Sequence, residues 1–340
     1  MKAAIFNPYL DTLGGGERYS MAVAGILLDL GYSVDIEWKD KSIKSKLENR
    51  FGINLEKVNF VESVNRGDKY DLCFWVSDGS IPTLKARKNI LHFQVPFTDM
   101  GAKTLMNRMK LFRISKVVCN SEFTKKIIDD EYGIDSVVIY PPVDIEEIKP
   151  KKKENIILFV GRFSQLKQVK NQDVLIESFK KFYDKSYSNW KLILAGGTEV
   201  GVDNYLNNLK DKIGEYPIEI FNSPDFKVLK QLFGKAKIFW SAVGYGKDEN
   251  REPDKVEHFG ISLVEAMSAN AVPIVFNAGG HKEIITKEIN GYLWDTPQEL
   301  IKITCNIIDK NIYSSITKNL TKEVQKYSYE SFKENLTKIL

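Results

Sequence analysis

The sequence has 340 residues, of which 43% are hydrophobic and 28% are charged. The length suits two domains of roughly 100–200 residues each, and the composition excludes a wholly disordered chain. The formal net charge of +4, from 49 basic and 45 acidic side chains, is too small an excess to indicate a nucleic-acid-binding protein.

The first part of the chain alternates short apolar runs with helical patterns. A helix is predicted at 17–30. Strands are predicted at 3–7, 33–38, 72–76, 89–93, 117–120 and 137–140. Strands separated by helical patterns indicate βαβ units and a parallel sheet. Two prolines and a lysine-rich run at 141–154 then mark a domain boundary, so we expect domains at 1–148 and 149–325.

The second part repeats this rhythm. Strands are predicted at 156–160, 191–195, 218–221, 238–241 and 272–276. Helices are predicted at 173–183, 226–234, 261–269, 297–309 and 329–340. The fold class is therefore α/β, with two Rossmann-like, doubly wound parallel sheets facing across a cleft. Ligands of such sheets bind at the carboxyl ends of the strands.

The loop after the first strand contains three glycines, Gly14, Gly15 and Gly16, directly before a helix. Glycines let the backbone approach a ligand closely, and a helix N-terminus favours an anion such as phosphate. The alternative is a tight turn that needs glycine only for its backbone angles. The spacing is not G-x-G-x-x-G, which weakens a dinucleotide interpretation.

The corresponding loop of the second domain contains Arg162, Lys167 and Lys170. Arg162 and Lys170 together would neutralise the charge of a diphosphate leaving group at this point. The alternative is a solvated basic loop, which we favour for Lys167 taken alone.

Glu257 and Glu265 lie eight positions apart around the predicted start of a helix. Eight helical steps turn about 800°, close to two whole turns, so both carboxylates can face one site. A carboxylate accepts two hydrogen bonds at once and suits the vicinal hydroxyls of a sugar. A surface helix would instead direct Glu265 into water, but its neighbours are apolar.

His92 follows an apolar run and is either a substrate contact or a satisfied core histidine. The three cysteines lie far apart, which argues against a disulfide framework or a zinc cluster. No Asp-x-Asp triplet occurs, which argues against a site where carboxylates bind a metal ion that in turn binds the diphosphate of a nucleotide sugar. No metal site is therefore expected.

Taken together, these motifs resemble those of retaining glycosyltransferases with the GT-B fold, glycosyltransferase family 4. Glu257 and Glu265 fit the E-x7-E signature of that family. The glycine-rich first loop, His92, the Gly161-Arg162 pair and the Gly279-Gly280 pair occur in the family's order along nearly the whole chain. The motifs are closest to those of mannosyltransferases that extend lipid-linked oligosaccharides from GDP-mannose.

The resemblance implies specific roles. Arg162 and Lys170 match the pair that holds the donor diphosphate, with Lys167 as a rival for the lysine role, because the spacing from Arg162 is longer than is common. Glu265 matches the ribose ligand, and Glu257 and His92 match residues near the transferred sugar. The implied catalytic residues are His92, Arg162, Lys170 and Glu257. The implied donor-binding residues are Gly15, Gly16, Arg162, Lys170, Glu257, Gly260, Ile261 and Glu265.

The implied activity is the transfer of a hexose, best mannose from GDP-mannose, to a hydroxyl of a glycan or lipid-linked acceptor. The anomeric configuration would be retained, and neither a metal nor another cofactor would be needed. A UDP-sugar donor is the first alternative. The family's final helix returns to the first domain, a role that residues 326–340 would fill.

Two other classes remain open at this point. A nicotinamide-dependent oxidoreductase would use the first loop for pyrophosphate and Asp35 or Glu37 for ribose. That interpretation leaves the glutamate pair and the second basic loop unexplained. The other class is a catalytically silent sugar-nucleotide-binding protein.

The sequence predicts a cytoplasmic protein, because it has no apolar run long enough to span a membrane and no signal-peptide pattern. Residues 103–113 mix basic and apolar side chains without an acid. This segment would rest on an anionic membrane surface beside a lipid-linked acceptor. The alternative is ordinary helix packing with a solvated basic face.

Overall fold

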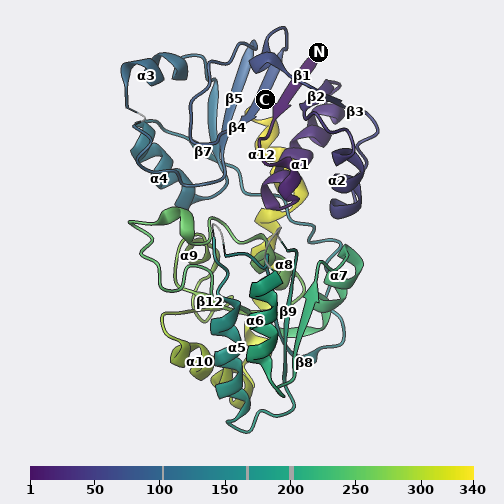
Figure 1. Ribbon diagram of the computed structural model, residues 1–340, viewed down its shortest axis with the longest axis vertical. Helices are drawn as coiled ribbons and strands as arrows, with labels where there is room; N and C mark the ends of the chain where they lie inside the picture. Colours follow the sequence, from purple (N-terminus) through teal and green to yellow (C-terminus); the bar gives the residue numbers. More distant parts are fainter. Residues whose placement is uncertain (102, 166–167, 199–202) are drawn as a thin grey trace. The chain divides into compact units, whose positions relative to one another are not determined.

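The computed structural model describes residues 1–101, 103–165, 168–198 and 203–340. The chain forms two compact units (Figure 1). Unit 1 contains Met1–Pro142 and Tyr329–Leu340, and unit 2 contains Val143–Ser328. Within the described ranges, no helix has the length and apolarity needed to cross a bilayer.

Unit 1 is built on a parallel sheet of seven strands in its described part, in the order β3-β2-β1-β4-β5-β6-β7. The strands are β1 (Lys2–Phe6), β2 (Ser33–Glu37), β3 (Val58–Val61), β4 (Leu72–Val76), β5 (Lys88–Phe93), β6 (Lys116–Cys119) and β7 (Val137–Val138). The helices are α1 (Gly15–Asp29), α2 (Ile43–Phe51), α3 (Leu105–Leu111), α4 (Glu122–Tyr132) and α12 (Tyr329–Thr337). The order reverses between β1 and β4, as in a doubly wound fold.

Unit 2 has six parallel strands among its described residues, in the order β10-β9-β8-β11-β12-β13. The strands are β8 (Glu154–Val160), β9 (Lys191–Gly196), β10 (Ile218–Asn222), β11 (Ala236–Ser241), β12 (Val272–Phe276) and β13 (Tyr292–Trp294). The helices are α5 (Gln172–Tyr183), α6 (Asp203–Ile213), α7 (Phe226–Lys235), α8 (Ile261–Ser268), α9 (His281–Ile284), α10 (Pro297–Asp309) and α11 (Tyr313–Glu323). Short 3-10 turns occupy Leu10–Thr12, Asn65–Gly67, Pro253–Lys255 and Val324–Tyr327.

The predicted elements are present, with small differences at their ends. The strand predicted at 137–140 ends at Val138, because Pro141 has no N–H and restricts Tyr140 before it. The helix predicted at 329–340 ends at Thr337. Two short strands, β3 and β13, were not predicted from the sequence.

The C-terminal helix α12 completes the core of unit 1, where it lies beside α1 in Figure 1. Phe332 and Leu336 are buried in that core. The Phe332 ring meets Tyr19 of α1 edge to face, with 4.9 Å between the ring centroids. Residues more than 300 positions apart therefore share one apolar cluster.

His92 lies in the same part of unit 1, at the carboxyl end of β5, and is fully buried. Its ring stacks on Tyr19 with a centroid distance of 4.2 Å, and its Nδ1 lies 3.2 Å from the Val118 carbonyl oxygen, to which it donates. Burial lowers the pKa of His92 to about 3, although the Val118 hydrogen bond opposes this shift. The imidazole is therefore neutral at pH 7.

We expect Phe332→Ala to lower the free energy of unfolding by about 3–5 kcal/mol, because it leaves a cavity under Tyr19. Urea denaturation of the purified chain measures this loss. Asn335→Ala, at an exposed position of the same helix, is the matched control and should change the stability little. Equal effects of the two substitutions would contradict the packing role of α12.

The second prediction concerns pH. An unfolded histidine titrates near its ordinary pKa of 6.5, whereas folded His92 titrates near 3. Between these values the unfolded state binds the extra proton, so the stability falls as the pH is lowered, by up to about 1.4 kcal/mol per pH unit.

In urea titrations at pH 7 and pH 5, His92→Asn should lose about 2 kcal/mol less than the parent chain over this interval. The asparagine amide retains a donor for the Val118 carbonyl, so the comparison isolates the titration. An identical loss in both proteins would show that His92 is not its source.

Candidate functional site

The candidate site of unit 2 lies where the strand order reverses, between β8 and β11. The loop after β8 carries Arg162, and the loop after β11 follows Ser241. Asn171, the residue before α5, joins these two loops, because its Nδ2 donates to the carbonyl oxygens of Ala242 (2.9 Å) and Tyr245 (3.2 Å). This position is where doubly wound sheets bind ligands.

The backbone of the β8 loop is held from two further sides. A Cβ at Gly196, the last residue of β9, would lie 1.9 Å from the Gly161 carbonyl oxygen, so only glycine fits there. The Gln172 side-chain amide donates to the carbonyl oxygen of Arg162 at 2.9 Å. These contacts fix the point from which the Arg162 side chain leaves the sheet.

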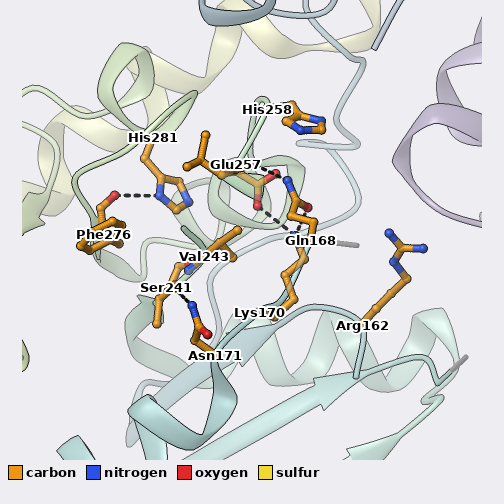
Figure 2. A network of polar contacts seen from close by, with 12 residues as sticks. Arg162, Gln168, Lys170, Asn171, Ser241, Val243, Glu257, His258, Phe276 and His281 are labelled. Carbon is orange, nitrogen blue, oxygen red and sulfur yellow. Dashed lines mark hydrogen bonds and ion pairs between the residues drawn. The ribbon is translucent and has the colours of Figure 1, made fainter. Parts of the chain in front are cut away.

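Lys170 and Glu257 form an ion pair in the interior of this site (Figure 2). Lys170 Nζ lies 3.3 Å from Glu257 Oε2 and donates to Gln168 Oε1 at 2.5 Å. The Lys170 side chain is 11% exposed and the Glu257 side chain is 17% exposed. Gln168 also donates to the Val256 carbonyl, so one amide links Lys170 to the segment that carries Glu257.

The electrostatics of the pair follow from burial and neighbouring charges. Burial lowers the pKa of Lys170, Glu257 opposes this shift, and the positive charge of Arg162 adds to it. For Glu257, burial acts to raise the pKa, but Lys170 and two histidines outweigh it and the pKa is lowered. The carboxylate therefore stays ionised at neutral pH. Arg162 lies apart from the pair in Figure 2, yet within electrostatic reach of Lys170.

The glycine pair after β12 packs directly on the segment that begins at Glu257. The Gly280 N–H donates to the Glu257 carbonyl oxygen at 2.7 Å. Gly279 has φ of +57°, and a Cβ there would lie 2.2 Å from the same oxygen. The Gly279 N–H donates to Glu249 Oε2 at 2.7 Å, and Glu249 also pairs with Lys282. Both amides are thus engaged by protein groups.

His281, the first residue of α9, is buried beside this pair of glycines. Its Nδ1 donates to the Phe276 carbonyl oxygen at 2.9 Å (Figure 2). Burial lowers the pKa of His281, whereas Glu257 and the Phe276 hydrogen bond oppose the shift. His281 therefore lines the site as a buried imidazole whose Nδ1 is engaged by the backbone.

Helix α8 carries the remaining predicted donor residues of unit 2. Gly260, with φ of +115°, precedes the helix, and Ile261 is its first residue. Glu265 lies one turn further on the same face and is 9% exposed among buried apolar neighbours. Glu257 precedes the helix by four residues, so the two glutamates belong to different local structures.

The other predicted residues lie elsewhere. Gly15 and Gly16 begin α1 in unit 1, where a Cβ at Gly16 would lie 1.9 Å from Gln94 Oε1. His92 is the core residue described above. Lys167, the alternative to Lys170 for the diphosphate lysine, lies outside the described residues.

Sequence reasoning missed Gln168 and Glu249 as site residues. Gln168 is a polar residue in a basic loop, and Glu249 is an acid in a highly charged stretch. Neither belongs to a motif, so their contacts with Lys170 and with Gly279 appear only in three dimensions.

The chain matches the family Glycosyl transferases group 1 over residues 142–323, which is more than half of its length. It is 28% identical over 246 residues to the Dictyostelium discoideum protein named GDP-Man:Man(3)GlcNAc(2)-PP-Dol alpha-1,2-mannosyltransferase. That match covers 66% of this chain and 46% of the relative. The chain thus spans about half the length of the curated relatives it matches.

Two solved structures share the fold. A glycosyltransferase from Rickettsia africae aligns with a TM-score of 0.78 and 19% identity, over 99% of this chain and 97% of that one. HepE from Anabaena, solved in complex with UDP, aligns with a TM-score of 0.76 and 18% identity, over 99% of both chains. They confirm the predicted GT-B architecture of two parallel-sheet α/β domains. With the match over residues 142–323, the chain belongs to the family of group 1 glycosyl transferases.

Proposed function

We propose that this chain transfers a hexose from a nucleoside diphosphate sugar to a hydroxyl of a glycan or lipid-linked acceptor, and that unit 2 binds the donor. The observation that carries the proposal is the arrangement of Arg162 and the Lys170–Glu257 pair at the switch point of the unit 2 sheet. A site with two cations at strand ends suits a diphosphate. Family membership favours this activity over that of a nicotinamide-dependent oxidoreductase.

In this mechanism the bond from the anomeric carbon to the diphosphate lengthens, and negative charge accumulates on the leaving oxygens. Arg162 and Lys170 stabilise that charge. Glu257 holds Lys170 in position through the 3.3 Å contact. Because these side chains supply the positive charge, we propose that no metal is needed.

Glu265 would accept hydrogen bonds from the ribose hydroxyls, with Gly260 and Ile261 beside it at the start of α8. In unit 1, His92 donates through Nδ1, so its Nε2 is an acceptor. That atom is buried without a hydrogen-bond partner among the described residues. We propose that it accepts a hydrogen bond from a substrate hydroxyl, and that Gly15 and Gly16 border the bound donor.

For the donor we propose GDP-mannose, because the relatives from Dictyostelium discoideum and Homo sapiens are named for that substrate. A UDP-sugar is the second candidate, because the structurally similar HepE was solved with UDP and with UDP-glucose. We further propose that the acceptor attacks from the face of the leaving group, so that the anomeric configuration is retained, and that the diphosphate accepts the acceptor proton.

Nucleotide binding tests the donor site. GDP at 100 times its dissociation constant should raise the free energy of unfolding by about 2.7 kcal/mol, detected as a thermal shift without added metal. Arg162→Ala and Lys170→Ala should each weaken binding by roughly tenfold to a hundredfold, the value of a charge-assisted hydrogen bond. A selective response to UDP would change the proposed donor and leave the site intact.

The matched control is Lys230→Ala, which removes a lysine of α7 that pairs with Glu147. It should leave nucleotide affinity unchanged. Equal affinity of the Arg162, Lys170 and Lys230 variants for GDP would contradict the proposal that Arg162 and Lys170 bind the diphosphate.

Transfer is tested with GDP-mannose, UDP-glucose and an alkyl mannoside acceptor in the presence of EDTA. We expect an α-linked product from GDP-mannose, identified by NMR, and unchanged turnover with EDTA. Glu265→Ala should raise KM for the donor because it removes two hydrogen-bond acceptors. Nucleotide binding without transfer to any acceptor tried would instead favour the silent binding protein.

A further inference from the structure

Helix α3 of unit 1 carries an unusual concentration of exposed apolar side chains. Leu105 is 75% exposed, Met106 63%, Met109 60% and Phe112, directly after the helix, 91%. These are four of the eight large hydrophobic side chains exposed in the part of the chain that the structure describes. Scattered exposed apolar residues are ordinary, but a cluster marks an interaction surface.

The four side chains form one face of the helix. Leu105, Met109 and Phe112 recur at spacings of four and three, and Met106 lies beside them, so all four fall within an arc of about 120°. Leu111 lies on the opposite side and packs against the buried cluster of Leu91 and Phe93. The arc therefore points away from the core of unit 1, at whose margin α3 lies in Figure 1.

Cations flank this face. At 100° per residue, Arg108 lies on one side of the arc and Lys110 on the other. Residues 103–113 contain four basic side chains and no acid. Arg113 donates to the Leu84 carbonyl oxygen at 2.7 Å and so supports the fold. Lys103, Arg108 and Lys110 have no carboxylate partner among the described residues.

We propose that α3 binds an anionic lipid surface, with the apolar arc inserted at the boundary between headgroups and acyl chains and with Arg108 and Lys110 on the headgroups. An apolar face flanked by cations has the chemistry of an interfacial helix. A second copy of the chain fits less well, because a two-fold contact of α3 with itself would bring cations against cations without an acid to balance them.

The expected binding is weak and reversible, because one short helix supplies little apolar area. It should also depend on salt, because the attraction of the cations is screened over a Debye length. The proposal does not rest on the proposed transfer activity, since it concerns the surface of unit 1 and its readout is binding alone.

Flotation of the full chain with vesicles tests the proposal. We expect co-flotation with vesicles of phosphatidylcholine and 30% phosphatidylglycerol in 50 mM NaCl, and little with pure phosphatidylcholine or in 500 mM NaCl. The double variant Arg108→Ala/Lys110→Ala should bind about 25-fold more weakly, about fivefold for each cation. Met109→Ser/Phe112→Ser should abolish co-flotation. All four positions lie on α3 or directly after it; Arg108, Met109 and Phe112 are exposed and Lys110 is half-buried, and thermal unfolding verifies that the variants are folded.

The matched controls are Lys41→Ala/Lys46→Ala, at exposed positions of unit 1, and Ile289→Ser, a 49% exposed apolar residue of unit 2. Both should bind like the parent chain. The proposal is overturned by absence of binding to the anionic vesicles at low salt, or by equal loss in the control variants. A concentration-dependent dimer that Phe112→Ser dissociates, without vesicle binding, would assign the face to a second copy.

Discussion

The ion pair between Lys170 and Glu257 is the contact around which the rest of the site in unit 2 is arranged. These residues are 87 positions apart, and burial would be costly for either charge alone. A buried pair of this kind adds little net stability, because desolvation offsets most of the attraction. Its effect is on arrangement, since the loop before α5 and the segment before α8 satisfy each other only in one relative position.

The surrounding backbone enforces that position. Gly279 and Gly280 let the loop after β12 lie against Glu257 and Phe259, where a Cβ would collide with main-chain atoms. Asn171 ties the β8 loop to the loop after β11. The loops after β8, β11 and β12 therefore meet at the carboxyl ends of their strands, where the parallel sheet reverses its order. The Lys170 ammonium is held in place by Glu257 and Gln168, and such preorganisation is the condition for electrostatic stabilisation of a developing charge.

Much of this was predictable from the sequence, because apolar runs and glycine-rich turns are local signals. The short strands β3 and β13 were missed, since the polar Asn59 interrupts β3, β13 has only three residues, and both gain their order from a neighbouring strand. Gln168 and Glu249 were missed because their roles depend on partners 88 and 30 residues away. For His92 the sequence left two interpretations open, and the structure shows a buried, neutral ring whose Nε2 has no hydrogen-bond partner among the described residues.

Both units have a loop between the carboxyl end of a strand and the start of a helix, and the two loops carry side chains of opposite charge. In unit 1 the loop before α1 is closed by an acid, because Glu17 Oε2 accepts hydrogen bonds from the Gly14 N–H at 2.6 Å and from Thr12 at 2.8 Å. That carboxylate already places a negative charge at the helix N-terminus, where an anion would otherwise be favoured. In unit 2 the corresponding loop before α5 presents Arg162 and Lys170. The loop of unit 1 is therefore closed by its own carboxylate, whereas the loop of unit 2 places two basic side chains at the strand ends.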